Sequence, residues 1–425
     1  MRTEQLDAGL FRSTASNGLV VLSETLPGVR SAAVGLWVRT ASAHEPVGQM
    51  GISHLLEHMV FKGTERRSAR ELALALEERG GSLDAFTGRD TTSFQAHVLD
   101  RDLPLAVDVL TDLVRRPLLR QADLDLERKV ILEEISGVDD TPDDLVFELH
   151  ARALWPDHPY GYSILGTRDT VSALTAADLR RLHDEAYFPG NCVIAAAGNV
   201  EHAVLLEALD KEGWFAGDAR PARAAVTPHP AQRGMVSKAE RDTTQSHMVL
   251  GTDTFSIADP RRFAVSLLVN ALGGGMSSRL FQRVREELGL AYAVYAYNQF
   301  HQGTGQLGIY VGTQPETADA ALETIQQELR RMAGEGLDAD ELAGGKRQMQ
   351  GQVMLALESP GARMSRLANF TLHREPYRTL DTIIQEIEAV PGAQVAEVAS
   401  EFLAPERQTV QRLGPEKTLG VRSDE

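Results

Sequence analysis

Hydrophobic residues recur along the chain with two different periods, which predicts that helices and strands alternate. In residues 105–116, LAVDVLTDLVRR, apolar side chains return every three or four positions, as on one face of an amphipathic helix. Residues 68–81, SARELALALEERGG, indicate a second helix that is closed by glycine. Residues 91–100, TTSFQAHVLD, indicate a strand, and residues 18–40 contain two apolar runs around a Pro-Gly turn. The two runs predict a hairpin that enters a sheet.

The order of these elements recurs in the second half of the chain at a constant distance. Leu113, in the first helix above, pairs with Leu329 in a similar helix. Pro189, in a turn between a helix and a strand, pairs with Pro405 in a similar turn, and the offset along the chain is the same for both pairs. Two agreements at one offset suggest a duplicated domain.

A passage without hydrophobic periodicity separates the two halves. Residues 216–234, AGDARPARAAVTPHPAQRG, are rich in Ala, Pro and Gly and form the best candidate linker. We therefore expect an N-terminal domain at residues 1–215 and a homologous C-terminal domain at residues 235–425. Since helices and short strands alternate in both, we predict the α+β class, with helices packed on a sheet in each domain.

Composition and charge narrow the classes of partner. With 43% hydrophobic and 24% charged residues, the chain has the composition of an ordinary soluble globular protein. A run of eighteen uninterrupted apolar residues is absent, so we expect no transmembrane helix and no membrane partner. The net charge of −17 argues against nucleic acid as a partner. Acidic residues that line a cavity would favour cationic ligands, although a solvated acidic surface is the simpler explanation.

The cysteine content and the N-terminal residues bear on the compartment. The one cysteine, Cys192, lies in the strand-like run NCVIAAAG, where a buried and inert thiol is expected rather than a nucleophile. A single cysteine excludes an intrachain disulfide and suits a reducing compartment. The first residues lack the basic segment and long apolar segment of a secretory signal. We therefore expect a cytoplasmic protein.

Two histidines mark the strongest candidate for chemistry. His54 and His58 lie four residues apart in GISHLLEHMVF, so on a helix their imidazoles project from one face about one turn apart. Both rings can then reach one Zn²⁺ ion at about 2.0–2.1 Å. Glu57, three residues after His54, is close enough to contact a metal-bound water. A core helix with an incidental histidine pair is the alternative, but polar groups buried among these apolar neighbours are costly without an ion or partners.

A catalytic zinc site needs a third protein ligand and one open position. The predicted helix ADLDLERKVILEEISG at residues 122–137 offers Glu127, Glu133 and Glu134. Glu127 and Glu134 are seven residues apart and share one face of that helix, which could be turned toward the histidines. The residues by themselves leave the choice of the third ligand open.

Further motifs connect this site to a known family. HLLEH is the inverted zinc signature H-x-x-E-H. Together with LDAFTGRDTTSF, LERKVILEEI and HPYGYSILGT, it resembles the inverzincin metallopeptidases, the family of pitrilysin, insulin-degrading enzyme and mitochondrial processing peptidase. The similarity runs through nearly the whole chain and is greatest to the short bacterial members. In that family the third ligand is a glutamate at a set distance after the second histidine, here Glu134, and a glutamate seven residues earlier, here Glu127, supports the site.

The resemblance implies a fold and a reaction. The fold would be two homologous domains, each with a mostly antiparallel sheet and helices packed on it. His54, His58 and Glu134 would bind Zn²⁺ and leave the fourth position to water. Glu57 would take a proton from that water and pass it to the leaving amine, while zinc polarises the scissile carbonyl.

The resemblance also implies where a peptide binds. Relatives hold the peptide by strand addition to a sheet edge, which falls here on the strand that begins with Ala85, Phe86 and Thr87. Many relatives have Asn where this chain has Asp84. That departure could alter the preference near the cleavage point but leaves the zinc ligands unchanged.

The second half of the chain implies a different contribution. The offset between the two halves carries the zinc ligands onto Asn270, Gly274 and Gln350, so the repeat has lost them. A glycine triplet nearby is weak support for a phosphate loop, because no Lys-Ser/Thr follows it. In the resembling family this region supplies an Arg and a Tyr, seven residues apart, that hold the substrate. Arg285 and Tyr292 have that spacing, the alternative being a surface Arg and a core Tyr.

The number of domains predicts how the chain assembles. In long relatives, four such domains on one chain enclose a chamber in which the Arg/Tyr domain faces the zinc domain. A chain with two domains can reproduce this only by pairing. We therefore expect a homodimer in which the zinc site of one subunit meets Arg285 and Tyr292 of the other.

Several functions compete at this stage. The leading one is a zinc endopeptidase for peptides or unfolded segments, either a processing enzyme that cuts near basic residues or a general peptide scavenger. A non-catalytic scaffold subunit of a heterodimeric peptidase or larger complex is the alternative from another class. Such subunits usually have a degraded zinc motif, whereas the motif is intact here. A purely structural zinc site fits less well, because only three protein ligands are present.

Overall fold

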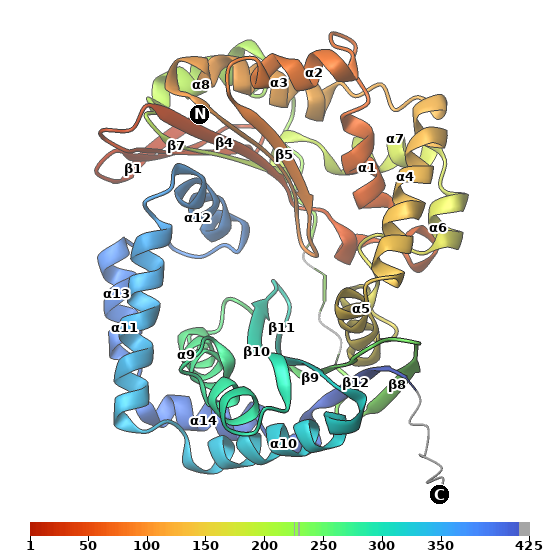
Figure 1. Cartoon of the computed structure of the whole chain (residues 1–425). Coiled ribbons are helices and arrows are strands. Elements are labelled where there is room, and N and C mark those ends of the chain that lie inside the picture. The colour runs from red at the N-terminus through yellow and green to blue at the C-terminus, as the bar shows by residue number, and fades with distance from the viewer. Residues whose placement is uncertain (225, 228–229, 416–425) are drawn as a thin grey trace, which may run out of the picture. The chain divides into compact units, whose positions relative to one another are not determined.

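The computed structural model describes residues 1–224, 226–227 and 230–415 (Figure 1). Parts of the predicted linker (225, 228–229) and of the predicted C-terminal domain (416–425) lie outside the described residues. Contacts within the chain divide it into two compact units, each built from three segments. Unit 1 consists of Met1–Ile135, Tyr162–Val226 and Gln352–Leu380, and unit 2 of Ser136–Gly161, Thr227–Gly351 and Asp381–Glu425.

Unit 1 is built on a seven-stranded sheet with the order β1-β2-β3-β7-β4-β6-β5. Only the β3–β7 pair is parallel, so the sheet is mostly antiparallel, as predicted. The strands are β1 (Arg2–Asp7), β2 (Leu10–Thr14), β3 (Val20–Thr25), β4 (Ser31–Val38), β5 (Ser82–Thr87), β6 (Thr92–Leu99) and β7 (Cys192–Gly198). The helices that follow the strand segments are α1 (Ile52–Val60), α2 (Ala69–Glu77), α3 (Leu103–Arg115), α4 (Gln121–Asp139), α6 (Arg168–Ala173), α7 (Ala176–Ala186), α8 (His202–Lys211) and α12 (Pro360–Leu372).

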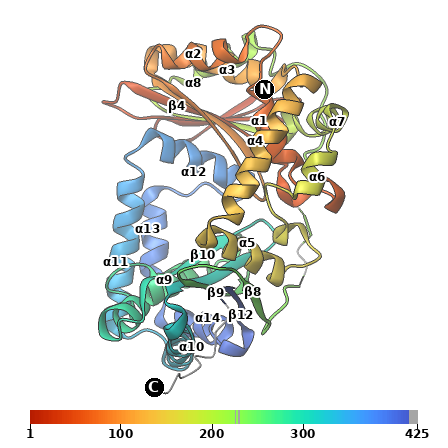
Figure 2. The same ribbon diagram turned by 45° about the vertical axis from the view of Figure 1, so that its right-hand side comes forward.

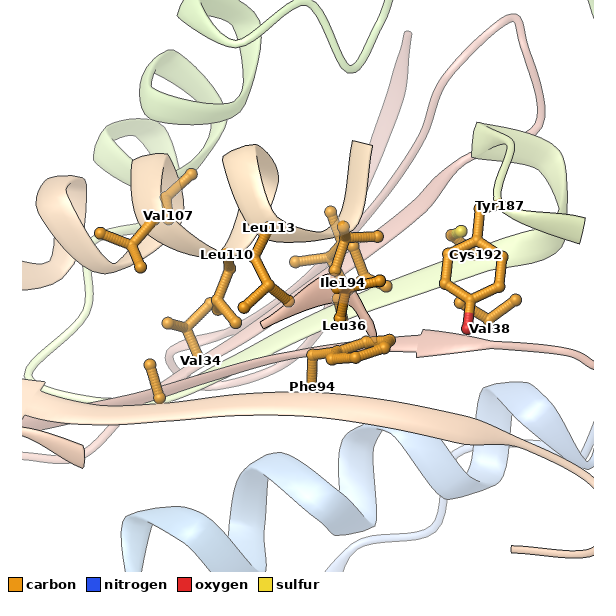
Figure 3. Close-up of a cluster of buried hydrophobic side chains, with 14 of the residues drawn as sticks. Val34, Leu36, Val38, Phe94, Val107, Leu110, Leu113, Tyr187, Cys192 and Ile194 are labelled. Atoms are coloured by element: carbon orange, nitrogen blue, oxygen red, sulfur yellow. The ribbon is translucent and has the colours of Figure 1, made fainter. Parts of the chain in front are cut away.

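The main core of unit 1 lies between this sheet and helix α3. Leucines and valines of α3 that recur at helical spacing pack onto β4, β6 and β7, where Phe94 is fully buried (Figure 3). Burial of a side chain of that size stabilises the fold by about 1.5–3 kcal/mol. Cys192, at the start of β7, is 1% exposed, as expected for an inert thiol, and burial raises its pKa to about 12.

The predicted hairpin at residues 18–40 is wrong. Its two strands, β3 and β4, form as expected, but they do not pair with each other because β7 lies between them. Val20 pairs with Val193 in parallel, and Val38 pairs with Cys192 in the antiparallel direction. The strand that separates them comes near the end of the first half of the chain, after several intervening helices. Local patterns cannot indicate such an insertion.

Unit 2 is built on a five-stranded sheet with the order β10-β11-β9-β12-β8. Its strands are β8 (Val236–Glu240), β9 (Ser246–Thr254), β10 (Ala291–Phe300), β11 (Gly305–Thr313) and β12 (Thr409–Gly414). Its helices are α5 (Pro142–Leu154), α9 (Arg262–Gly273), α10 (Ala318–Glu335), α11 (Ala339–Ala356), α13 (Leu380–Ala389) and α14 (Gly392–Phe402). Apolar residues of α9, α10 and α14 form the main core on one face of this sheet.

The five strands of unit 2 repeat the topology of five strands in unit 1. In unit 1, β7 lies between β3 and β4 and pairs in parallel with β3. In unit 2, β12 lies between β8 and β9 and pairs in parallel with β8. The offset that relates Leu113 to Leu329 is kept, because it also relates the start of β3 at Val20 to the start of β8 at Val236. Helix α3 begins at Leu103 and helix α10 at Ala318, so the offset between their first residues is nearly the same. The predicted class of two homologous α+β domains is therefore confirmed.

Two helices at equivalent positions pack on the sheet of the other half of the sequence. Helix α5, which follows α4, packs on β9 and β12 of unit 2 (Figure 2). Helix α12, which follows α11, packs on β3, β4 and β7 of unit 1. The units are therefore discontinuous in sequence. The domain boundaries proposed at residues 215 and 235 stay a prediction. The segments that contain α5 and α12 lie in the unit opposite to the one that these boundaries would assign. No described helix has the length and apolar character needed to cross a membrane.

His150 fixes helix α5 to the sheet of unit 2. Its Nε2–H donates to the carbonyl oxygen of Thr409 at 3.1 Å, and its Nδ1 lies 3.2 Å from the amide nitrogen of Gln306. Gly251 permits this approach, because a Cβ there would lie 2.7 Å from the imidazole ring. The side chain is completely buried, and this burial lowers the pKa of His150 to about 4.

The buried imidazole makes the stability of the protein depend on pH. The unfolded chain binds a proton at His150 near pH 6.5 and the folded chain only near pH 4. The stabilisation by neutral His150 is therefore complete above pH 6.5 and is lost as the pH falls toward 4. Between pH 7.5 and pH 5, wild type should lose about 2 kcal/mol more unfolding free energy than His150→Asn in urea titrations. The same substitution at the exposed His97 serves as the control, and equal pH dependence of wild type and His150→Asn would contradict the prediction.

Candidate metal centre

Helix α1 presents its three polar chemical groups on the face that the core leaves free. Leu55, Leu56, Met59 and Val60 are fully buried in the core of unit 1. His54, Glu57 and His58, by contrast, are only partly buried. Positions three and four residues apart lie on one helical face, so the three side chains share a surface. The helix is both a core element and the carrier of a polar site.

Glu134 of helix α4 faces the two histidines. One oxygen of its carboxylate lies 3.9 Å from Nε2 of His54 and the other 3.7 Å from Nε2 of His58. The ligand atoms of these residues all lie within 4.8 Å of one another, which suits a shared metal ion. Glu133, the neighbouring candidate, is exposed and lies outside this cluster.

The hydrogen bonding of the cluster tests whether it suits a metal. Oε2 of Glu134 is buried and has no hydrogen-bond partner among the described residues. Such an oxygen is destabilising unless a cation or a water satisfies it. Two imidazole nitrogens and one carboxylate form a donor set found in catalytic zinc sites. The residues present therefore fit a divalent transition metal such as zinc.

Glu127 lies seven residues before Glu134 on the same face of α4 and holds His58 in place. Its Oε1 lies 2.9 Å from Nδ1 of His58, while its other oxygen forms an ion pair with Lys62. The Glu127 side chain is almost fully buried. A carboxylate on Nδ1 places the proton there and leaves Nε2 as the metal-binding nitrogen.

Burial also prepares His54 for a metal. Burial, followed by the nearby His58, lowers the pKa of His54 to about 4. The ring is therefore neutral at physiological pH, which is the form that binds a metal ion.

Glu57 lies outside the ligand cluster and has a different partner. The hydroxyl of Thr87, at the end of β5, donates to Oε2 of Glu57 at 2.5 Å. Burial raises the pKa of Glu57, and the hydrogen bond from Thr87 opposes that change. A carboxylate that touches the site without being a ligand can accept and return a proton.

A residue that the sequence reasoning missed holds the start of helix α1. Gly51 occupies the N-cap position and has no side chain to accept from the helix, so Glu45 supplies the acceptor. The two oxygens of Glu45 accept from the backbone N–H groups of Gly51 and Ser53, each at 2.8 Å. Burial raises the pKa of Glu45 to about 7, and these N–H donors oppose the shift. A helix of this importance without a capping Ser, Thr, Asp or Asn at its start was the available signal.

The glycine at the cap is required by its surroundings. Gly51 has φ +89°, in the left-handed region, and a Cβ there would lie 2.5 Å from the carbonyl oxygen of Leu165. Gly166 approaches Met50 just as closely from the other side. A residue with a side chain therefore does not fit at position 51, and the cap has to come from elsewhere in the chain.

The predicted substrate strand lies at a sheet edge, but Ala85, Phe86 and Thr87 end strand β5 (Ser82–Thr87) and do not begin a strand. Strand β5 pairs only with β6 and ends the sheet of unit 1. Phe86 is 66% exposed, whereas Thr87 is 4% exposed and Ala85 packs against the core. Asp84 is exposed on the same side as Phe86. The strand thus has a free edge beside the helix that carries the site.

Arg285 and Tyr292 are brought together in unit 2. Nη1 of Arg285 donates to the carbonyl oxygen of Tyr292 at 3.0 Å, and the guanidinium lies 4.5 Å from the centre of the Tyr292 ring. Arg285 lies in a π-helical turn, Phe281–Glu287, a geometry that is frequent at functional sites. Tyr292 is 76% exposed and is not a core residue.

Unit 2 has no equivalent of the histidine cluster among the described residues. Asn270, at the position of His54, donates to Gln348 of α11 at 3.1 Å. Gly274 only ends helix α9, and Gln350 contacts Glu388. Neutral amides therefore bridge the two helices that would correspond to those of the metal cluster.

Comparison with known proteins matches two successive parts of the chain to two family models. Residues 20–168 match the family model described as insulinase (peptidase family M16). Residues 173–349 match the model described as the peptidase M16 inactive domain.

Similar proteins cover nearly the whole chain. A protein of Streptomyces coelicolor named an uncharacterized zinc protease is 40% identical over 96% of this chain and 90% of its own length. A protein of Bacillus subtilis with the same description is 39% identical over 89% of this chain and 92% of its length. The crystal structure of a protease from Helicobacter pylori has the same fold, with a TM-score of 0.89 at 22% identity over 96% of this chain and 99% of that chain. A peptidase M16 inactive domain from Pseudomonas fluorescens gives the same score and identity, over 96% of this chain and 98% of that one.

Replacement of Glu45 tests whether it holds helix α1. Glu45→Ala leaves two buried N–H groups at the helix start without an acceptor, so the unfolding free energy should fall by about 1–3 kcal/mol. Chemical denaturation measures the change, with Glu65→Ala, at an exposed position, as the matched control. Equal stability of the two variants would show that the cap is dispensable.

Proposed function

Because this chain belongs to the insulinase family of peptidases, peptidase family M16, we propose that it is a zinc-dependent endopeptidase. Its substrates are peptides or unfolded protein segments. The observation that carries the proposal is the pairing of a ligand set, His54, His58 and Glu134, with a separate carboxylate, Glu57, on the same helix face. A structural zinc site would have no use for the second carboxylate and usually has four protein ligands.

The metal is held by the two Nε2 atoms and the Glu134 carboxylate. When bound, zinc supplies Lewis acidity at the scissile carbonyl and lowers the pKa of a coordinated water. Glu127 keeps His58 in the tautomer that exposes Nε2, with Lys62 on the far side of the carboxylate. The zinc assignment is supported by the relatives, which are named zinc proteases.

Glu57 carries the proton in the proposed reaction. Its carboxylate takes a proton from the attacking water and gives it to the nitrogen of the leaving amine. A pKa that burial raises suits this role, because a more basic carboxylate accepts a proton from water more readily. Thr87 holds one carboxylate oxygen while the other faces the proton.

The peptide binds in the proposal as an additional strand on β5. Main-chain hydrogen bonds to the free edge around Ala85, Phe86 and Thr87 require an extended segment, so folded proteins are excluded. The net charge of −17 favours segments with basic residues only weakly. A processing role and a scavenging role are separated by the cleavage profile on a peptide library.

We also propose that the active enzyme is a homodimer. Unit 2 repeats the topology of unit 1 without its ligands and carries the exposed pair Arg285 and Tyr292. In the homodimer this pair binds the substrate at the zinc site of the partner subunit. A heterodimer with a different chain is the competing assembly, and a cytoplasmic location stays a prediction.

The alternative function is a non-catalytic scaffold subunit. The match to an inactive-domain model covers residues 173–349, which include none of His54, Glu57, His58 and Glu134. In the first half the residues His54, His58 and Glu134 lie close enough to share a metal ion, and Glu57 is on the same helix as the two histidines. That arrangement favours catalysis.

Substitution of Glu57 tests the proposal most simply. Glu57→Gln should keep one zinc per chain, because Glu57 is not a ligand, but lower kcat for a fluorogenic peptide by about 10²–10⁴-fold. Removal of zinc by a chelator should abolish hydrolysis by wild type, and added zinc should restore it. The control is Glu133→Gln on the exposed face of α4. A Glu57→Gln protein with its metal and full activity would refute the mechanism.

Mixed dimers test the composite site. Arg285→Ala and Glu57→Gln chains should each be inactive alone. After dissociation and reassembly in equal amounts, half of the dimers contain one intact site, so activity should return to about one quarter of wild type. Native mass spectrometry confirms that mixed dimers form. If they form and activity stays absent, the shared-site model fails.

A further inference from the structure

The end of the edge strand β5 is joined to the proposed base by a side chain. Thr87 is the last residue of β5 and is 4% exposed. Its hydroxyl donates to Oε2 of Glu57 at 2.5 Å. Side chains alternate along a strand, so Thr87 and Ala85 point toward helix α1 while Phe86 points away from them.

The hydrogen bond from Thr87 restricts the Glu57 side chain, which is otherwise free to rotate. A glutamate has three rotatable side-chain torsions, and a base must stay within hydrogen-bond reach of the proton that it abstracts. The Thr87 hydroxyl holds Oε2 of Glu57 and leaves Oε1 for the proton. His54 and His58 belong to the same helix, so the orientation of Glu57 relative to the ligands is fixed as well.

We infer that Thr87 is a positioning residue that couples peptide binding on β5 to the orientation of Glu57. The inference rests on the proposed function and adds a link between its binding step and its chemical step. A peptide paired with the edge of β5 restricts the end of the strand, and Thr87 transmits that restriction to the base. Binding and proton transfer are then parts of one rigid arrangement.

Three variants separate orientation of the base from general stability. Thr87→Val removes the hydroxyl with little change of shape, and Thr87→Ser keeps the hydroxyl. Thr92→Val is the matched control, because Thr92 pairs with Thr87 across the strands, is fully buried and donates to Thr40 instead of Glu57. All three leave the zinc ligands in place.

The readouts are kcat and KM on one fluorogenic peptide, zinc content, and crystal structures of the metal-free proteins. For Thr87→Val we expect kcat to fall about tenfold or more with KM and zinc content unchanged, since part of the general-base contribution is lost. Thr87→Ser should recover most of kcat, and Thr92→Val should keep it. In the Thr87→Val structure the Glu57 carboxylate should leave its wild-type position.

Several results would overturn the inference. An unchanged kcat in Thr87→Val, a change confined to KM, or an equal loss in Thr92→Val would each exclude a specific role in orienting Glu57. If wild type hydrolyses no peptide, the proposed function fails, and the structures alone then decide the inference. A Glu57 carboxylate in the same position in wild type and Thr87→Val would contradict it.

Discussion

The hydrogen bond between Glu127 and Nδ1 of His58 is the constraint on which the site depends. Helix α4 has only three buried residues, Leu124, Glu127 and Ile131. A carboxylate is therefore one of the three buried side chains of this helix. Because Glu134 follows on the same face, the contact that fixes the imidazole also brings the third metal-binding group to the histidines. A buried carboxylate is stable in that position because Lys62 and His58 satisfy both of its oxygens.

The duplicated topology explains how one chain carries two kinds of site. Five strands of each unit have the same order, and in both units helices pack on one face of the sheet. In the first, helix α1 and helix α4 carry imidazoles and carboxylates, and in the second the amides Asn270 and Gln348 bridge the corresponding helices. The second unit instead exposes Arg285 beside Tyr292. In our proposal the second unit binds substrate instead of metal, while the shared fold is retained.

Much of this organisation was predictable from the sequence, where the signals are local. The periodicity of residues 105–116 predicted helix α3, and the spacing of His54 and His58 predicted that both lie on one face of a helix. The choice of Glu134 over Glu133 needed the resemblance to a family, because spacing along the chain does not show which face of α4 meets α1. The geometry then placed Glu134 in the cluster and left Glu133 exposed.

The remaining features depend on contacts between distant segments. Strand β7 separates β3 from β4, so two runs that look like a hairpin do not pair. Helices α5 and α12 pack on sheets of the other half, and neither amphipathic pattern indicates which sheet it covers. Glu45 was missed because it caps a helix through space, across a loop, at a position where Gly166 excludes any side chain. Long-range packing therefore decided what local pattern could not.

The central claim is that one zinc ion lies between helices α1 and α4 with three protein ligands. A crystal structure of the zinc-loaded protein, with anomalous data collected on both sides of the zinc absorption edge, tests it directly. We expect one strong anomalous peak per chain, about 2.0–2.2 Å from Nε2 of His54, Nε2 of His58 and the Glu134 carboxylate, with no fourth protein ligand. A peak elsewhere, a fourth protein ligand, or coordination of the metal by Glu57 would contradict it.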